Sequence, residues 1–292
     1  MVDPVPAALP AAICDTHVHV IGSQREHPML PDRHYTPPLA TVDDLRAHLQ
    51  RVGATRTVIV QPSVYGVDNR CLLDALAALQ GQACGIAVLP QDVPMATLRA
   101  LDRQGVRGIR LNLESVGQTN AALLKDQLQR WATPLAELGW HLQIYAPFEV
   151  LAACTEVLVT LPVPTVMDHI ALWSDASLTS PAAQQLLRAF DSGSLYLKLS
   201  GSYRVPLRDP DALHAVVTRL LHLRSDRLLW ASDWPHTNRA PGVAPTEESP
   251  YRPISAASLV AERTRWLPSP WAQQVLVDNP ARLYRFGAAD RV

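Results

Sequence analysis

The sequence predicts an α/β protein that folds as a single (β/α)8 barrel. Three observations support this prediction: eight short apolar runs alternate with amphipathic segments, 25 prolines fall mostly between them, and 48% of the 292 residues are hydrophobic. Strict alternation implies parallel strands joined by right-handed crossovers, and eight such units imply a closed barrel. The apolar fraction is sufficient for one large core.

The predicted strands are short runs of apolar or β-branched residues bounded by turn residues. They cover 12–20, 55–62, 83–90, 106–113, 141–147, 164–170, 195–201 and 228–235. The predicted helices lie between and after them and cover 41–53, 68–81, 95–105, 123–139, 148–161, 180–190, 209–223 and 269–286. Thr41 and Asp44 form a capping-box pattern at the start of the first helix, and Gly53 ends it.

Nothing in the sequence divides the chain into separate units. There is no composition shift or flexible linker, so we expect one domain over 1–292, with 1–10 as an N-terminal extension. The alternative is an open doubly wound sheet, but no glycine-rich phosphate turn follows the first predicted strand.

Composition excludes several classes of partner. The formal net charge is −1 and no run of like charges occurs, so neither nucleic acid nor a membrane surface is expected as a partner. No apolar stretch reaches the roughly 20 residues of a spanning helix, and the N-terminal segment lacks the basic start of a signal peptide. The four cysteines are widely spaced, which is typical of reduced core thiols in a cytoplasmic protein.

Polar residues at the ends of the predicted strands are the candidates for function, because the active site of a (β/α)8 barrel lies at the C-terminal ends of its strands. These residues are His17, His19, Gln61, Ser63, Arg110, Asn112, Tyr145, Asp168, His169, Lys198, Ser200, Ser232 and Asp233. All of them should meet at one mouth of the barrel. Histidines in loops and helices, such as His48, receive no role, while His141 should be structural and His236 lies close enough to Asp233 to support it.

His17 and His19 are two residues apart on a strand, so their side chains should share a face. Alone, such a pair is usually hydrogen-bonded structure at a strand end. With His169 and Asp233 at the ends of two other strands, the four residues match the ligand types of zinc or a similar cation. We therefore expect this quartet to be the catalytic centre and a candidate mononuclear metal site.

The same quartet supports ester hydrolysis. Asp233 can take a proton from water and return it to the departing oxygen. The three histidines either hold a metal that acts as a Lewis acid or donate hydrogen bonds to the oxyanion. No serine lies in a GxSxG elbow, which disfavours a covalent serine hydrolase.

Four motifs carry a family resemblance: "DTHVH" at 15–19, "DH" at 168–169, "SDWPHTN" at 232–238 and "DNPARLYRF" at 278–286. Together they resemble the amidohydrolase superfamily in its amidohydrolase-related branch, and within it the hydrolases of pyrone dicarboxylate lactones, sugar lactones and muconolactones. The resemblance therefore implies a carboxylated or sugar-acid-type lactone as substrate. The resemblance implies a (β/α)8 fold, lactone hydrolysis, and Asp233 as general base. It also implies that some members bind one divalent cation, zinc or manganese here, while the pyrone lactonase branch works without one.

Substrate binding should come from residues that recognise oxyanions or hydroxyls. Arg110 can make a bidentate contact with a carboxylate, and Arg204 is a second candidate. The resemblance adds positions that contact substrate in the pyrone lactonases, namely Tyr35, Ser63, Tyr145 and Asn238.

Some positions depart from that group. Two basic residues of the pyrone lactonases are replaced here by Val116 and Leu172, so we expect a lactone with less charge than a dicarboxylated pyrone. Trp173 and Trp234 could supply an apolar wall for its ring. Dinuclear members of the superfamily bridge two metals with a lysine or glutamate on or near the fourth strand, and the fourth predicted strand here has neither, so a dinuclear site is not expected. Lys198 on the seventh predicted strand is expected to be an ion-pair partner.

Two other classes of function remain open. A zinc-dependent decarboxylase of the same superfamily would use the same histidine and aspartate set, and release of carbon dioxide would distinguish it. A non-catalytic binding protein conflicts with four chemically competent residues at one barrel mouth. The expected partner is a small lactone, and the protein is expected to be a monomer or a homodimer.

Overall fold

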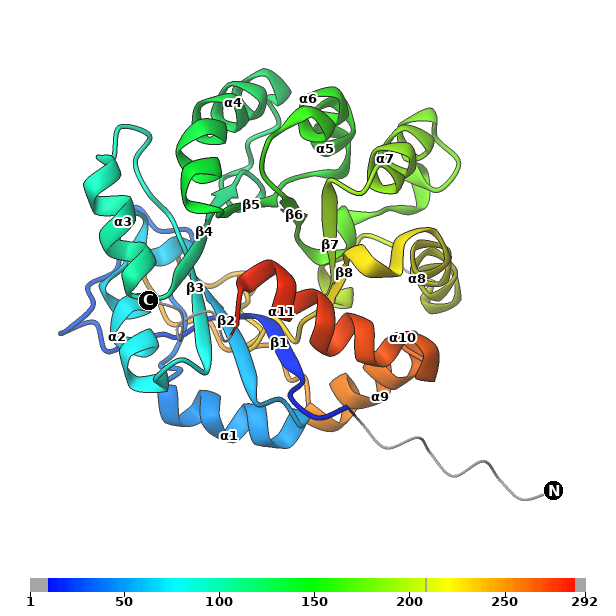
Figure 1. Ribbon diagram of the computed structural model, residues 1–292. Coiled ribbons are helices and arrows are strands. Elements are labelled where there is room, and N and C mark those ends of the chain that lie inside the picture. Colours follow the sequence, from blue (N-terminus) through cyan, green and yellow to red (C-terminus); the bar gives the residue numbers. More distant parts are fainter. Residues whose placement is uncertain (1–9, 208, 287–292) are drawn as a thin grey trace.

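The prediction of a (β/α)8 barrel is confirmed. The computed structural model describes residues 10–207 and 209–286, in which eight parallel strands follow one another in sequence order (Figure 1). The strands are β1 (Cys14–Val18), β2 (Arg56–Val60), β3 (Ala83–Ala87), β4 (Val106–Asn112), β5 (His141–Tyr145), β6 (Thr165–Met167), β7 (Leu195–Leu199) and β8 (Leu228–Trp230). Beyond β8, the chain returns to the first strand through a parallel bridge between Val18 and Trp234. Apart from Pro10, the predicted extension 1–10 lies outside the described residues.

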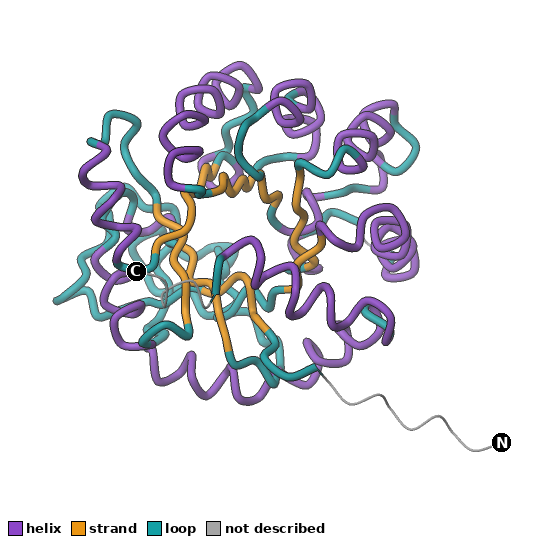
Figure 2. Tube along the Cα trace, viewed as in Figure 1, coloured by secondary structure: helices purple, strands orange, loops and turns teal. Residues whose placement is uncertain are grey.

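The helices form an outer ring around the strands (Figure 2). They are α1 (Val42–Val52), α2 (Arg70–Leu79), α3 (Met95–Arg103), α4 (Ala121–Leu138), α5 (Phe148–Ala153), α6 (Thr155–Thr160), α7 (Pro181–Asp191), α8 (Pro210–Arg224), α9 (Ala256–Trp266), α10 (Ser269–Gln273) and α11 (Asn279–Tyr284). The predicted capping box of Thr41 and Asp44 is present at α1. No helix in the described ranges combines the length and the apolar character that crossing a bilayer requires.

Two predicted helices are divided in the structure, and one helix was not predicted. The segment predicted as one helix over 148–161 is divided at Cys154 into α5 and α6, and the last helix is divided into α10, a π-helical turn and α11. Helix α9 was not predicted. Its buried face carries Arg263, whose Nη1 donates to the Val52 carbonyl at 2.8 Å, and a buried arginine interrupts the apolar pattern that indicates a helix.

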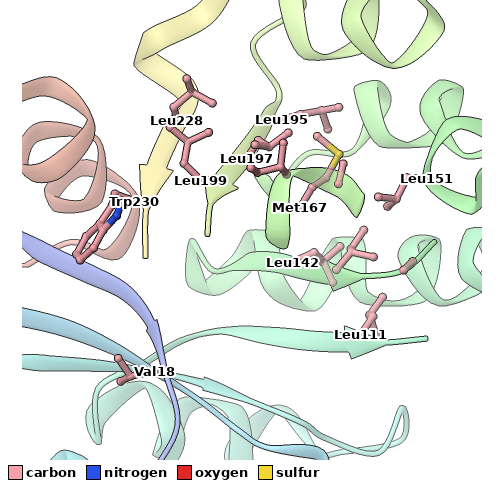
Figure 3. Close-up of a cluster of buried hydrophobic side chains, with 14 of the residues drawn as sticks. Val18, Leu111, Leu142, Leu151, Met167, Leu195, Leu197, Leu199, Leu228 and Trp230 are labelled. Atoms are coloured by element: carbon pink, nitrogen blue, oxygen red, sulfur yellow. The ribbon is translucent and has the colours of Figure 1, made fainter. Parts of the chain in front are cut away.

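Alternation along the strands decides which side chains face the barrel interior. Leu195, Leu197 and Leu199 of β7 belong to the main apolar cluster, together with residues of other strands and Leu151 of α5 (Figure 3). Side chains of opposite parity point inward. Lys198 of β7 therefore meets Gln143 of β5 inside the barrel, with Nζ to Oε1 at 2.8 Å.

Helix α11 covers the barrel interior at the N-terminal ends of the strands. Tyr284 of α11 is buried, and its ring meets the ring of His141 edge-on at 5.2 Å. His141 thus packs at the N-terminal ends of the strands, opposite the ends where the polar residues meet, which agrees with its predicted structural role. The interior of β5 runs from His141 through Gln143 to Tyr145, which places Tyr145 at the mouth.

Gly108 of β4 allows the close approach of β5. A Cβ at this position would lie 2.6 Å from the His141 backbone oxygen, and backbone cannot move aside as a side-chain end can. We expect Gly108→Ala to destabilise the protein by about 1–3 kcal/mol through overpacking. Thermal unfolding followed by circular dichroism measures this, and an unchanged midpoint would contradict the contact.

The four cysteines are free and buried, in agreement with the prediction of core thiols. Burial raises the pKa of Cys84 to about 11 and the pKa of Cys14 well above its ordinary value. We expect the folded protein to react negligibly with a thiol reagent at pH 8, because the thiolate is the reactive form. Four thiols should become reactive in denaturant; rapid labelling before unfolding is the result that would refute this expectation.

Candidate active site

Three histidines surround one carboxylate oxygen at the C-terminal ends of the strands. The Nε2 atoms of His17 and His19 each lie 3.8 Å from Oδ1 of Asp233, and the Nε2 of His169 lies 3.9 Å from it. All four residues are buried. The structure therefore brings together the whole predicted quartet, with the two histidines of the first strand on one face as the two-residue spacing predicts.

Unusual backbone conformations aim these side chains. Four consecutive non-glycine residues, from His169 to Leu172, have positive φ angles between 49° and 53°, and Asp233 has a φ of 60°. Left-handed conformations cost non-glycine residues roughly 1–3 kcal/mol each and persist only where surrounding contacts enforce them. Because these residues include His169 and Asp233, the strained backbone coincides with the site, which indicates that the side chains of the quartet are oriented at a cost in local stability.

The second oxygen of Asp233 is fully engaged. Oδ2 accepts a hydrogen bond from Nε of Arg204 at 2.5 Å and from the hydroxyl of Tyr203 at 2.6 Å. Burial raises the pKa of Asp233, but the Arg204 guanidinium and the three histidines together hold the pKa well below its usual range. Asp233 is therefore ionised, and Oδ1, which has no hydrogen-bond partner in the described chain, is the oxygen free to act.

Hydrogen bonds at Nδ1 determine what each histidine can offer at Nε2. Nδ1 of His19 lies 2.7 Å from the Val60 carbonyl, which can only accept, so Nδ1 carries the proton and Nε2 a lone pair. Nδ1 of His169 lies 3.0 Å from Oγ of Ser200, which can donate or accept. Burial lowers the pKa of His19 and of His169 to about 4, so both are neutral at pH 7.

His17 has two competing partners below it. Its Nδ1 lies 3.3 Å from Oδ1 of Asp168 and also 3.3 Å from Nζ of Lys198. With Asp168 as acceptor, Nε2 is left with a lone pair; with Lys198 as donor, Nε2 carries the proton. Burial lowers the pKa of His17 well below its usual range, so this ring is also neutral.

Asp168 and Lys198 form a buried charged layer under the histidines. Asp168 lies 3.5 Å from Nζ of Lys198 and 3.5 Å from Nη2 of Arg110, and accepts a hydrogen bond from Gln143 at 3.1 Å. Burial raises the pKa of Asp168, but its contacts with His17, Lys198 and Arg110 lower it well below the ordinary value. Burial also lowers the pKa of Lys198 to about 8. The expected role of Lys198 as an ion-pair partner is confirmed.

The donor set fits a single divalent cation. His17, His169 and Asp233 each offer a ligand atom, and these atoms lie within 4.8 Å of one another. His17 Nε2 and Asp233 Oδ1 are buried and lack hydrogen-bond partners in the described chain. Neutral imidazoles held through Nδ1, with a carboxylate beside them, are the arrangement that zinc sites use.

A pocket of about 260 Å³ opens above the quartet. Its wall contains all six predicted substrate-binding residues, namely Tyr35, Ser63, Arg110, Tyr145, Arg204 and Asn238. It also contains His19, His169 and Asp233. The six residues predicted to contact substrate therefore all lie in the wall of one pocket. Arg204 also has protein partners, because its Nε donates to Asp233 and its Nη2 donates to the carbonyl and the hydroxyl of Thr237.

Several residues of this region were not found from the sequence. The pocket wall also contains Arg239, Arg252 and Glu114, and Tyr203 binds Asp233 from behind it. The arginines lie in the long connection after β8, where no periodicity marks a side chain as inward. The adjacency of Tyr203 to Arg204 was the one available signal.

Two expectations require correction. Trp173 packs on Phe148 at 5.1 Å between ring centres, and Trp234 stacks on His48 at 5.5 Å, so neither tryptophan forms a wall of this pocket. His48 was given no role, yet its buried Nε2 lies 3.3 Å from Oδ2 of Asp15 and 3.1 Å from Oγ of Ser232, the residue next to Asp233. His236 does lie near the site, with Nδ1 3.4 Å from the Tyr203 hydroxyl.

Comparison with known proteins places this geometry in a family. A family profile described as Amidohydrolase matches residues 14–286. The chain belongs to the amidohydrolase family. Its described fold and its histidine and aspartate quartet therefore agree with the resemblance that the sequence motifs carry.

This amidohydrolase has similar relatives along nearly its whole length. It is 31% identical over 301 residues to a 2-pyrone-4,6-dicarboxylate hydrolase of Comamonas testosteroni, with 94% of this chain and 91% of that protein covered. It is 28% identical over 285 residues to a 4-sulfomuconolactone hydrolase of Rhizobium radiobacter, with coverage of 96% and 92%. A crystal structure from Pseudomonas putida, of a protein provisionally named 2-pyrone-4,6-dicarboxylic acid hydrolase, superposes with a TM-score of 0.78 at 30% identity and covers 96% of this chain and 99% of its own.

Proposed function

We propose that this amidohydrolase opens the ring of an anionic lactone by attack of an Asp233-activated water on the lactone carbonyl. The observation that carries the proposal is Oδ1 of Asp233, a residue of the pocket wall: Oδ1 has no hydrogen-bond partner in the described chain, while Oδ2 is held by Arg204 and Tyr203. The relatives named for hydrolysis of a pyrone dicarboxylate and of a sulfomuconolactone support a lactone substrate.

The proposed reaction balances with one aspartate as proton carrier. Oδ1 of Asp233 takes a proton from water as the water oxygen bonds to the carbonyl carbon. The ring C–O bond then breaks, and the same proton passes from Asp233 to the departing oxygen, which leaves a hydroxy acid. A carboxylate with a depressed pKa is a weak base, so the carbonyl must also be polarised by a cationic group.

The histidines constrain how that polarisation occurs. Neutral His19 presents a lone pair at Nε2 and cannot donate a hydrogen bond to an oxyanion. His17 can donate from Nε2 only when Lys198 occupies its Nδ1. His17, His19, His169 and Asp233 would hold a divalent cation, zinc or manganese, which would supply Lewis-acid polarisation of the carbonyl when bound.

Metal analysis combined with a lactone screen tests the proposal. The purified protein is assayed with mono- and dianionic lactones using a pH indicator, before and after chelation, and its zinc and manganese contents are measured. Proton release with a lactone supports the proposal, and loss of activity on chelation that zinc restores supports the metal-assisted form. If no lactone reacts but an aromatic or enoic acid releases carbon dioxide, the decarboxylase alternative replaces it.

A further inference from the structure

We propose that Arg252 is a specificity-determining residue that binds a second oxyanion of the substrate, a carboxylate or a sulfonate remote from the lactone carbonyl. The inference rests on the proposed function and extends it to a residue that no sequence motif marks. It also revises the expectation of a weakly charged lactone, which rested on Val116 and Leu172 alone.

The arginines of the pocket wall differ in their partners. Arg204 lies against one buried aspartate at 2.5 Å, and Arg110 lies 3.5 Å from another. The exposed Arg239 donates to a backbone carbonyl at 3.3 Å. Among the described residues, the side chain of Arg252 makes no ion pair or hydrogen bond, and its buried Nε has no partner. A cation held at a pocket wall without a protein acceptor is suited to an anionic ligand.

Arg252 is held in place by its surroundings. Its backbone N–H donates to the His236 carbonyl at 3.0 Å, and its guanidinium carbon lies 5.2 Å from the centre of the Tyr203 ring. The preceding residue, Tyr251, donates its hydroxyl to the Pro38 carbonyl at 2.5 Å. Residues 251 and 252 are thus held by His236, in the connection after β8, and by Pro38, in the connection between β1 and α1. Because Arg252 is already held in place, less entropy is lost when an anion binds.

The position of Arg252 separates it from Arg110. Arg252 lies over the ring of Tyr203, whose hydroxyl holds Oδ2 of Asp233. Arg110 extends from β4, and its guanidinium carbon lies 5.4 Å from the ring centre of Tyr145 on β5. Tyr203 follows β7 and Tyr145 ends β5, so the two cations pack on aromatic rings that belong to different strand ends. One molecule with two oxyanions can contact both while its carbonyl faces Asp233.

Glu114 is the acidic group in the same wall. It forms no ion pair with any described residue, and burial raises its pKa. Because the pocket wall carries four arginines against this one glutamate and the engaged Asp233, its charge favours anions.

Unreactive ligands test the inference independently of catalysis. Binding of benzoate, isophthalate and 3-sulfobenzoate is measured by calorimetry for the wild type, Arg252→Met and the control Arg130→Met, which removes an exposed arginine of α4 that is not part of the pocket wall. We expect Arg252→Met to weaken binding of both dianions by about 10- to 100-fold while benzoate changes little, because an ionic hydrogen bond is lost. Arg252→Lys should restore part of the dianion affinity, and Arg130→Met should behave as the wild type.

Two results would overturn the inference. One is an equal loss of benzoate and dianion binding in Arg252→Met, and the other is an equal loss in both arginine variants. The arms with isophthalate and 3-sulfobenzoate show whether a carboxylate or a sulfonate is preferred. Ring opening of a monoanionic lactone, measured in parallel, should persist in Arg252→Met; if the wild type opens no lactone, the proposed function fails whatever the calorimetry shows.

Discussion

Replacement of Asp233 by asparagine is expected to lower kcat for lactone hydrolysis by about 10²- to 10⁴-fold, the range that a positioned general base contributes. The amide keeps the size of the carboxylate but cannot take a proton from water. Its Oδ1 position faces three histidines at 3.8–3.9 Å, and no other carboxylate lies within 4 Å of those Nε2 atoms in the described chain. Initial rates over a range of lactone concentrations separate the effect on kcat from the effect on KM.

Two controls make this result interpretable. Asp74→Asn removes a carboxylate that is 73% exposed and remote from the pocket, and it should leave kcat unchanged. Calorimetry with isophthalate shows whether the variant still forms the pocket, since Arg204 loses its ionic partner. A variant that binds the dianion and retains kcat within tenfold of the wild type would exclude Asp233 as the base.

Replacement of Asp168 by asparagine should destabilise the fold by about 3–5 kcal/mol, the cost of removing one partner from a buried ion pair. Lys198 and Arg110 would then lack their shared anion inside the barrel. Because the pKa of Asp168 is lowered in the folded state, its contribution is present above the unfolded pKa of about 3.9 and is lost as pH falls through the folded value. Chemical denaturation at pH 7 measures the effect.

The pH dependence provides the second half of this test. The difference in stability between the wild type and Asp168→Asn should shrink as pH falls below about 4, because the carboxyl of the unfolded wild type then takes up a proton while the folded carboxyl stays ionised. Asp43→Asn, which removes the exposed partner of Arg46, should leave the denaturation midpoint unchanged at pH 7. Equal midpoints for all three proteins would show that the buried layer contributes no net stability.

The parts of the site that lie on strands could be predicted from the sequence. His17 on β1 and Tyr145 on β5 occupy inward positions that follow from the two-residue period of a strand. His19 lies one residue past β1 and Asp233 three residues past β8. Barrel geometry then requires these residues to converge. Neither argument depends on long connections or on the partners of individual atoms.

The remaining parts depend on backbone that carries no periodic signal. Trp173 was expected at the pocket, but the left-handed turn from His169 to Leu172 directs it to Phe148, and no glycine in that turn marks it in the sequence. Arg252 lies 19 residues beyond Asp233 in a connection, and backbone hydrogen bonds, not strand alternation, return it to the pocket. That Asp168 and Lys198 both approach Nδ1 of His17 follows from the three-dimensional packing and has no signal in the sequence.

The bridge between Val18 and Trp234 also has a consequence for the order of events during folding. Asp15 on β1 accepts a hydrogen bond from the backbone of Ser232, which follows β8 and lies 217 residues away in the sequence. The chain segment that carries His17 and His19 and the segment that carries Asp233 therefore come together only after the ring of strands has closed. Contacts of such sequence separation form late because loop-closure entropy opposes them. During refolding, recovery of catalysis should therefore lag behind recovery of the helical circular dichroism signal. The rate at which activity returns would then report the rate of barrel closure.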